Sequence, residues 1–176
     1  IPALLSRSGL SERDRALATE LAFGTLRRLP GLDRAIGLRS SRPIARMSPG
    51  ARAALRLGAY QIAFTRIPPH AAVGESVGLA APRERGFVNA ILRRLADDPP
   101  PPPIGEGDGD VSARTGLAPW AVRELRVLLG DDAELAAEAL SERGWLSLRT
   151  NTCQTSVSAL SDTLRAAGLD PRPAPL

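Results

Sequence analysis

Two helical patterns separated by a short turn, between residues 66 and 96, constrain the fold of this chain most strongly. Apolar residues recur at helical spacing over residues 69–80 and again over residues 84–96, and Pro82 interrupts the pattern between them. The sequence therefore predicts two helices joined by a tight turn. Arginine and amide side chains occupy the turns and the polar edge of the second helix. The segment is thus either a buried helical hairpin or a surface that docks RNA.

The composition also favours helices. Apolar residues make up 43% of the 176 residues, enough for the core of one mid-sized domain or two small ones. Aromatic residues make up only 3%, so the core must consist of Leu, Ala, Val and Ile, which suits packed helices better than a β-sandwich. No run reaches the roughly 20 apolar residues of a membrane span, and the first residues do not resemble a secretory signal. We therefore expect a cytoplasmic protein without a membrane partner.

The first 98 residues are predicted to be all-α. One helix begins at the capping residue Ser11 and is expected to end at Pro30, and a short segment follows it over residues 32–38. A second long helix begins at Ser48, with Pro49 in its first turn, and continues to about Thr65. Together with the hairpin of residues 69–96, these helices make a first domain of residues 1–98.

A change in composition follows this domain. Residues 99–103 are all proline, and residues 104–110 consist almost entirely of glycine and acidic residues, so we expect a linker over residues 99–111. In residues 112–176 the pattern predicts a helix from Leu117 that contributes Trp120, Leu125 and Leu128 to the core. It also predicts a helix over residues 131–143, a strand over residues 145–151, and a helix over residues 156–167. One strand cannot form a sheet alone, so this part is predicted to be a small, incomplete α+β subdomain.

The charge of the chain is distributed unevenly. All 23 basic residues are arginine, and 16 of them lie in residues 1–98 together with 8 acidic residues, which gives that half a balance of +8. Residues 99–176 have 7 arginines and 11 acidic residues, a balance of −4. A compositional bias can explain the missing lysines but does not explain the asymmetry. Because phosphate backbones attract such a surplus of positive charge, nucleic acid is the expected partner.

The reactive residues exclude several functions. A single cysteine, Cys153, and a single histidine, His70, offer no cluster for a metal site and no internal disulfide. His70 follows two prolines at a helix start, and no nucleophile motif accompanies it, which argues against a hydrolase. No glycine-rich strand-to-helix turn for a dinucleotide or similar cofactor is present. We therefore predict neither a metal nor a catalytic residue in this chain.

Several stretches of the sequence together resemble one known family. They are Arg13–Leu17 leading to Leu21–Arg27, Leu57–Ile62, Arg66–Val73 and Gly86–Arg93, with weaker matches at Ala118–Trp120 and Leu148–Asn151. With these residues the chain resembles the N-terminal part of bacterial ribosomal RNA cytosine-5 methyltransferases of the Sun/Fmu type. The first domain of those enzymes is similar to the antitermination factor NusB.

The resemblance implies a fold and a role for each part of the chain. Residues 1–98 would form a NusB-like helical bundle, and the small subdomain after the linker would precede the methyltransferase domain. The family's S-adenosylmethionine-binding domain and catalytic cysteines would follow Leu176, and Cys153 lies outside the family's proline-cysteine motif, so Cys153 is interpreted as a structural thiol. Family members have a further helix ahead of the position of Ile1. An uncovered N-terminal face, available for self-association, is therefore expected.

The resemblance and the charge together suggest that this region docks ribosomal RNA. Arginine can contact phosphate oxygens through two nitrogens or stack on unpaired bases. Two alternatives stay open: a free-standing NusB-like antitermination factor, and a helical module that binds protein. The candidate RNA contacts are basic or amide side chains from both parts of the chain: Arg66, His70, Arg83, Arg85, Asn89, Arg93, Arg94, Arg149 and Asn151.

Overall fold

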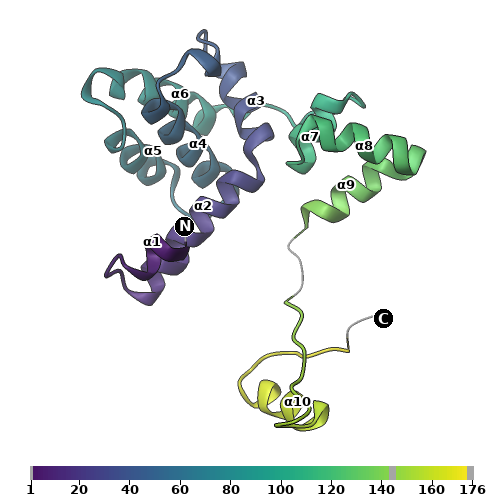
Figure 1. The fold of residues 1–176 in the computed structure, drawn as a ribbon. Helices are drawn as coiled ribbons and strands as arrows, with labels where there is room; N and C mark the ends of the chain where they lie inside the picture. Colours follow the sequence, from purple (N-terminus) through teal and green to yellow (C-terminus); the bar gives the residue numbers. More distant parts are fainter. Residues whose placement is uncertain (1, 143–145, 174–176) are drawn as a thin grey trace. The chain divides into compact units, whose positions relative to one another are not determined.

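The computed structural model describes residues 2–142 and 146–173, and these residues are mainly helical (Figure 1). They belong to two compact units, residues 1–142 and residues 143–176. The α-helices of the first unit are α1 (Pro2–Ser6), α2 (Glu12–Arg27), α3 (Leu29–Arg39), α4 (Pro49–Phe64), α5 (Pro69–Gly78), α6 (Arg85–Asp97), α7 (Asp108–Thr115), α8 (Pro119–Leu129) and α9 (Ala133–Ser141), and the second unit has α10 (Val157–Ala166). Short 3₁₀ turns lie at Ile44–Arg46 (η1), Pro82–Glu84 (η2) and Gly130–Asp132 (η3).

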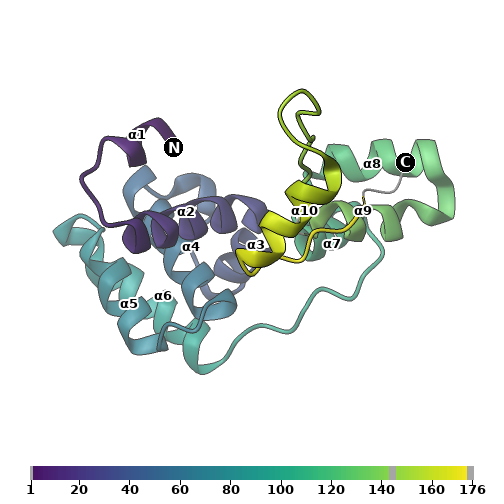
Figure 2. The ribbon, with the colours of Figure 1, turned by 90° about the horizontal axis from the view of Figure 1, so that it is seen from below.

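Helix α4 is the centre of the first bundle, which comprises α2 to α6. It contacts α2, α3, α5 and α6, and these helices lie around it in both views of the ribbon (Figure 1 and Figure 2). The core is built from aliphatic side chains, as the composition predicts, and includes Leu32, Ile36, Leu55, Val73, Val88, Ile91, Leu92 and Leu95. Helices α4, α5 and α6 coincide closely with the predicted helices at 49–65, 69–80 and 84–96. The prediction that this part of the chain is mainly α is confirmed.

Small residues on α4 let its neighbours approach closely. Gly58 is buried, and a Cβ atom added there would lie 2.6 Å from a methyl carbon of Leu92 on α6 and 2.9 Å from the Ser76 Oγ on α5. One turn further along, the Gln61 Nε2 donates a hydrogen bond to the Ser76 Oγ at 3.3 Å. The three helices therefore meet at a point where only a glycine fits, and a polar pair is satisfied inside the core.

The path between α2 and α4 differs from the prediction at Pro30. The sequence predicts that Pro30 ends the first helix and that a short segment follows; in the structure α2 ends at Arg27, and Pro30 lies in the first turn of α3. Proline is tolerated there because the first amide groups of a helix have no partner within it. The resulting α3 supplies Leu32 and Ile36 to the core and carries Asp33, which pairs with Arg56 of α4 at 2.7 Å.

A group of three short helices, α7 to α9, completes the first unit. Its small core consists of Val111, Val122 and Ala137, with Leu117 and Leu125 partly buried against them. Helix α7 packs against α3, and a Cβ atom at Gly31 of α3 would lie 2.5 Å from the Ala113 carbonyl oxygen. This packing differs from the predicted division at residues 99–111, since the compact unit continues through the proline run to Glu142.

Two predictions for this segment are wrong. The glycine-acid stretch is not all linker, because Asp108 and Asp110 lie in the first turn of α7, where carboxylates favour the helix dipole. Trp120 and Leu128 of α8 are not core residues, since they are 64% and 75% exposed. Only Val122 of α8 is buried, and Trp120, two positions earlier, projects from the opposite side of the helix.

The predicted strand does not form over residues 146–151, the part of it that the structure describes. Trp145 lies outside the described residues, and residues 146–150 have no regular secondary structure. Leu146 and Leu148 alternate with polar residues but are 86% and 59% exposed, because residues 146–173 offer no second strand to pair with. Helix α10 forms as predicted, with Ser156 as its N-cap and Gly168 just past its end at a φ of 80°.

The first prediction concerns the glycine at the meeting point of three helices. Gly58→Ala should destabilise the protein by about 1–3 kcal/mol, because the added methyl group would force Leu92 and Ser76 to move. Chemical denaturation monitored by circular dichroism measures this change. Gly37→Ala is the matched control, since a Cβ at Gly37 of α3 meets nothing within 4 Å. Equal stability of the two variants would contradict the close packing described here.

The second prediction uses the only tyrosine. The Tyr60 hydroxyl donates to the Glu20 Oε1 at 2.6 Å, and burial, reinforced by this contact with Glu20, raises the pKa of Tyr60 above its ordinary value of 10.0. The unfolded chain therefore loses the proton first, so the stability contributed by neutral Tyr60 is complete below pH 10 and decreases as the pH rises through the folded-state pKa.

Thermal melting between pH 8 and pH 11 should show a Tm that falls above about pH 10 in the wild type. The fall should be much smaller in Tyr60→Phe. The chain has no lysine and no other tyrosine, and a Cys153→Ser background removes its only thiol from both proteins. A parallel fall in Tyr60→Phe would assign the effect to another group.

Candidate nucleic-acid interface

The predicted arginine stripe lies on the exposed side of η2 and α6. Arg83, Arg85 and Arg93 are exposed and Asn89 is half-buried, while the opposite side of α6 is buried in the core. The Arg93 Nε donates to the Asn89 Oδ1 at 3.2 Å, and the Arg85 Nε donates to the Ala80 carbonyl oxygen at 3.3 Å. Within residues 2–142 and 146–173, no carboxylate lies within salt-bridge distance of these three guanidinium groups. Their positive charge therefore faces solvent.

Arg94 has a different surrounding from that stripe. It follows Arg93 by about 100° around the helix, and its Nη1 donates to the Arg39 carbonyl oxygen at the end of α3, at 3.3 Å. Arg39 in turn donates to the Asp98 carbonyl oxygen and carboxylate, at 2.6 and 2.8 Å. Arg94 thus helps to hold the ends of α3 and α6 together, a contact that the sequence pattern alone did not indicate.

Arg66 and His70 lie at the turn from α4 to α5, and both are exposed. The turn is fixed locally: the Thr65 Oγ1 donates to the Gln61 carbonyl oxygen at 2.8 Å and accepts from the Ile67 amide at 3.2 Å. Pro68 and Pro69 then begin α5. The two basic side chains are therefore presented on a rigid turn rather than on a flexible loop.

The two remaining candidates belong to the second unit. Arg149 and Asn151 are exposed, and the Asn151 Oδ1 accepts a hydrogen bond from the Cys153 amide at 3.1 Å. This contact is a local turn, which accounts for an asparagine at this position. Cys153 itself is exposed and unpaired.

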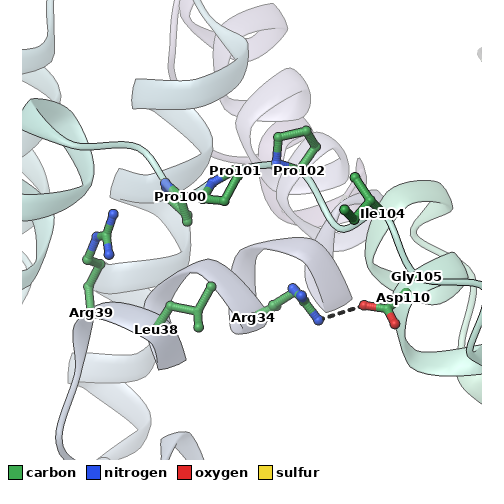
Figure 3. A pocket seen from close by; sticks show the side chains of 9 residues that line it. All are labelled: Arg34, Leu38, Arg39, Pro100, Pro101, Pro102, Ile104, Gly105 and Asp110. Atoms are coloured by element: carbon green, nitrogen blue, oxygen red, sulfur yellow. Dashed lines mark hydrogen bonds and ion pairs between the residues drawn. The ribbon is translucent and has the colours of Figure 1, made fainter.

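The structure adds a feature that the sequence pattern did not reveal: a hollow beneath the proline segment, residues 99–104. Figure 3 shows Pro100 to Pro102 crossing above α3, with Leu38, Arg34 and Arg39 beneath them. A cavity of about 560 Å³ lies here, and a second of about 630 Å³ shares Arg34, Leu38 and Pro100–Pro102 with it. The second cavity extends along α3 and α4 to Phe64, whose ring is 51% exposed.

Arginines fix the walls of this hollow. The Arg114 Nη1 donates to the carbonyl oxygens of Pro103 and Gly105, at 3.0 and 2.7 Å, and its other nitrogen pairs with Glu134. Arg34 pairs with Asp110 at 2.8 Å, as drawn in Figure 3. The proline segment thus stands away from the bundle, held at its far end by side chains of α3 and α7.

Two findings limit the chemistry of the described residues. No three His, Cys, Asp or Glu side chains gather closely enough to hold a metal ion in the part of the chain that the structure covers. None of the helices over residues 2–142 and 146–173 has the length and hydropathy needed to cross a membrane. The exposed arginines and the hollow are therefore the candidate functional features of the described surface.

The bundle and its sequence match one family model, that of the NusB family, over residues 2–97. The chain belongs to the NusB family. The solved structure of PH0851 has a similar fold, with a TM-score of 0.60 and 18% identity, over 95% of this chain and 39% of that one. At this level of identity the likeness concerns the fold alone.

Curated relatives of this NusB-family chain are named as methyltransferases. The ribosomal RNA small subunit methyltransferase B of Pseudomonas putida is 34% identical over 173 residues, 96% of this chain and 39% of the relative. The enzyme of the same name from Yersinia enterocolitica is 28% identical over 95% of the chain and 39% of the relative. The resemblance predicted from the motifs is confirmed, and the chain spans about two fifths of the length of these relatives.

The prediction from this site tests what holds the proline segment in place. Arg114→Met keeps the apolar stem but removes every donor to Pro103, Gly105 and Glu134, so it should destabilise the protein by about 1–3 kcal/mol. Limited proteolysis should also cut faster within residues 99–107. Arg123→Met is the control, because Arg123 is 60% exposed and reaches Asp108 only at 3.7 Å. Unchanged cleavage in Arg114→Met would show that other contacts hold the segment.

Proposed function

We propose that this chain is the RNA-docking N-terminal region of an S-adenosylmethionine-dependent ribosomal RNA cytosine-5 methyltransferase. Its membership of the NusB family and its likeness to enzymes named ribosomal RNA small subunit methyltransferase B support this proposal. In it, the chain holds ribosomal RNA while the methyl transfer is carried out by another part of the longer protein. A cytoplasmic location is part of the same proposal, since ribosomal RNA is the substrate.

The observation that carries the proposal is the row of arginines on η2 and α6. Arg83, Arg85 and Arg93 come from elements whose backbone is fixed by the core, and all three are exposed without a pairing carboxylate in the described residues. Such guanidinium groups are suited to contact phosphate oxygens of an RNA strand, with Asn89 between them as a donor and acceptor. Arg66 and His70 would extend the contact from the α4–α5 turn, and Arg94, Arg149 and Asn151 stay lesser candidates.

The residues described here do not fit S-adenosylmethionine itself. They form no strand, and a doubly wound cofactor site requires a glycine-rich turn between a strand and a helix. Cys153 lies in an exposed turn without a neighbouring base or cation in hydrogen-bond contact. In this proposal the chain's own residues bind and orient RNA and carry no step of the transfer.

One observation favours a second candidate function, a helical module that binds protein. Helix α2 exposes three large apolar side chains, Leu17, Phe23 and Leu26, at 46%, 40% and 56%. Phe23 and Leu26 lie about 60° apart around the helix, whereas Leu17 lies on the opposite side. A free-standing NusB-like antitermination factor would combine such a protein contact with RNA binding. The RNA titration described below separates a module that binds only protein from the two candidates that bind RNA.

The test of the proposal is a titration of single-stranded RNA at several salt concentrations. Arg83→Gln combined with Arg93→Gln should weaken binding and reduce the salt slope of log K by about 1.4, since each lost phosphate contact removes about 0.7. The melting temperature should stay unchanged, because neither side chain packs in the core.

Arg165→Gln combined with Arg172→Gln is the matched control. It removes the same charge from two arginines that pair with Asp162 and Asp170, so RNA affinity should change little. A wild-type protein whose RNA binding is absent or independent of salt would exclude phosphate contact and favour the protein-binding module.

A further inference from the structure

We propose that the larger cavity beneath the proline segment, called the base pocket here, receives one unpaired nucleobase of the docked RNA. This inference rests on the proposed function, since it assumes that RNA is the partner. It adds a site for a base to a surface that otherwise contacts phosphates. The residues that would form it lie outside the arginine row of η2 and α6.

The size and walls of the base pocket suit a planar aromatic group. Its volume of about 630 Å³ falls within the range of about 300–1,000 Å³ that small-molecule sites occupy. The walls are aliphatic side chains and prolines, with Leu32 and Leu38 from α3, Ile62 and Ala63 from α4, and Pro100–Pro102 above them. A base that leaves its stack in the RNA would replace its stacking contacts by contacts with these apolar walls. Water fills such a space poorly, because apolar walls offer it few hydrogen bonds.

Flat groups stand at one end of the pocket. The guanidinium of Arg28 lies over the Phe64 ring, 5.3 Å from its centroid, and the Tyr60 ring stacks against Phe64 at 5.5 Å with an interplanar angle of 26°. Phe64 is half exposed, which is unusual for a large apolar side chain in a chain with only three phenylalanines. Aromatic rings and arginine planes are the surfaces on which unpaired RNA bases stack.

The charge of the pocket favours a nucleotide over an apolar peptide side chain. Three arginines and no carboxylate line it. Arg34 and Arg114 are paired with Asp110 and Glu134 beside the pocket, whereas Arg28 donates to the Arg114 carbonyl oxygen and pairs with no carboxylate of the described residues. Arg27 and Arg66 lie next to Arg28 and close to Phe64 in the chain, and both are exposed. A base inside the pocket would bring its phosphate to this end, where the cations can neutralise it.

The experiment blocks the pocket without changing its charge. Ala63 of α4 lines the cavity and is exposed, so Ala63→Trp should place an indole in the space without disturbing the core. The probe is a single-stranded RNA with 2-aminopurine at an internal position, and a duplex RNA of the same length has no unpaired base to offer. Affinity follows from fluorescence anisotropy, and stacking of the base follows from quenching of 2-aminopurine.

Ala63→Trp should weaken single-stranded RNA binding by about 5-fold to 100-fold, the range expected for one stacked base, and should abolish the quenching. Its affinity for duplex RNA should not change. Ala53→Trp, on the same helix, exposed and remote from the pocket, should behave as the wild type in every assay. Thermal melting confirms that both variants fold.

A second pair of variants keeps the inference falsifiable if Ala63→Trp is unstable. Phe64→Leu should lose quenching and single-strand affinity, and Phe64→Tyr should retain both. Equal single-strand affinity in Ala63→Trp and Ala53→Trp, or full quenching in Phe64→Leu, would overturn the base pocket while leaving the arginine row intact. Loss of binding in Arg83→Gln with Arg93→Gln alone would then support the proposed function without the pocket.

Discussion

The close approach of helices to α4 is the constraint on which the rest of the first unit depends. Ala51, Ala54, Gly58 and Ala59 are buried along α4, and these small side chains let α5 and α6 pack against its backbone. This packing fixes the α4–α5 turn and the orientation of α6. The exposed side of α6 and the turn carry most of the arginines proposed to contact RNA, so the position of these charges is set by the packing of residues that carry none.

The arginines have two distinct uses in this chain. Arg39, Arg56, Arg94 and Arg114 donate to carbonyl oxygens or carboxylates and hold elements together. Others face solvent on η2, α6 and the α4–α5 turn. A count of charge cannot separate the two groups, because every arginine adds one positive charge to the total whatever it contacts. Carboxylate partners separate most of them, since Arg39, Arg56 and Arg114 each pair with one. Arg83, Arg85 and Arg93 pair with none among the described residues, which leaves their charge for an external phosphate.

The sequence predicted the first domain well where the helical spacing of apolar residues agreed with the positions of capping residues and prolines. Ser48, Pro49 and Pro69 marked helix starts correctly, and the apolar residues that recur over residues 84–96 include Val88, Ile91 and Leu92 of the core. It failed at Pro30, which starts a helix instead of ending one, and at Leu146 and Leu148, whose alternation formed no strand because a strand depends on a partner. The hollow beneath the prolines was beyond prediction, since Arg28, Phe64 and Pro101 are far apart in sequence and no local pattern links them.

The proline segment has a consequence for how the hollow persists. Five successive residues without an amide hydrogen cannot pair with a neighbouring backbone, and their ring-locked dihedrals hold an extended rod of about 3 Å per residue. An ordinary loop of this length would collapse onto the leucines of α3 and fill the space. A rod anchored at both ends instead keeps the apolar cavity open at little entropic cost, because its stiffness is already present in the unfolded chain.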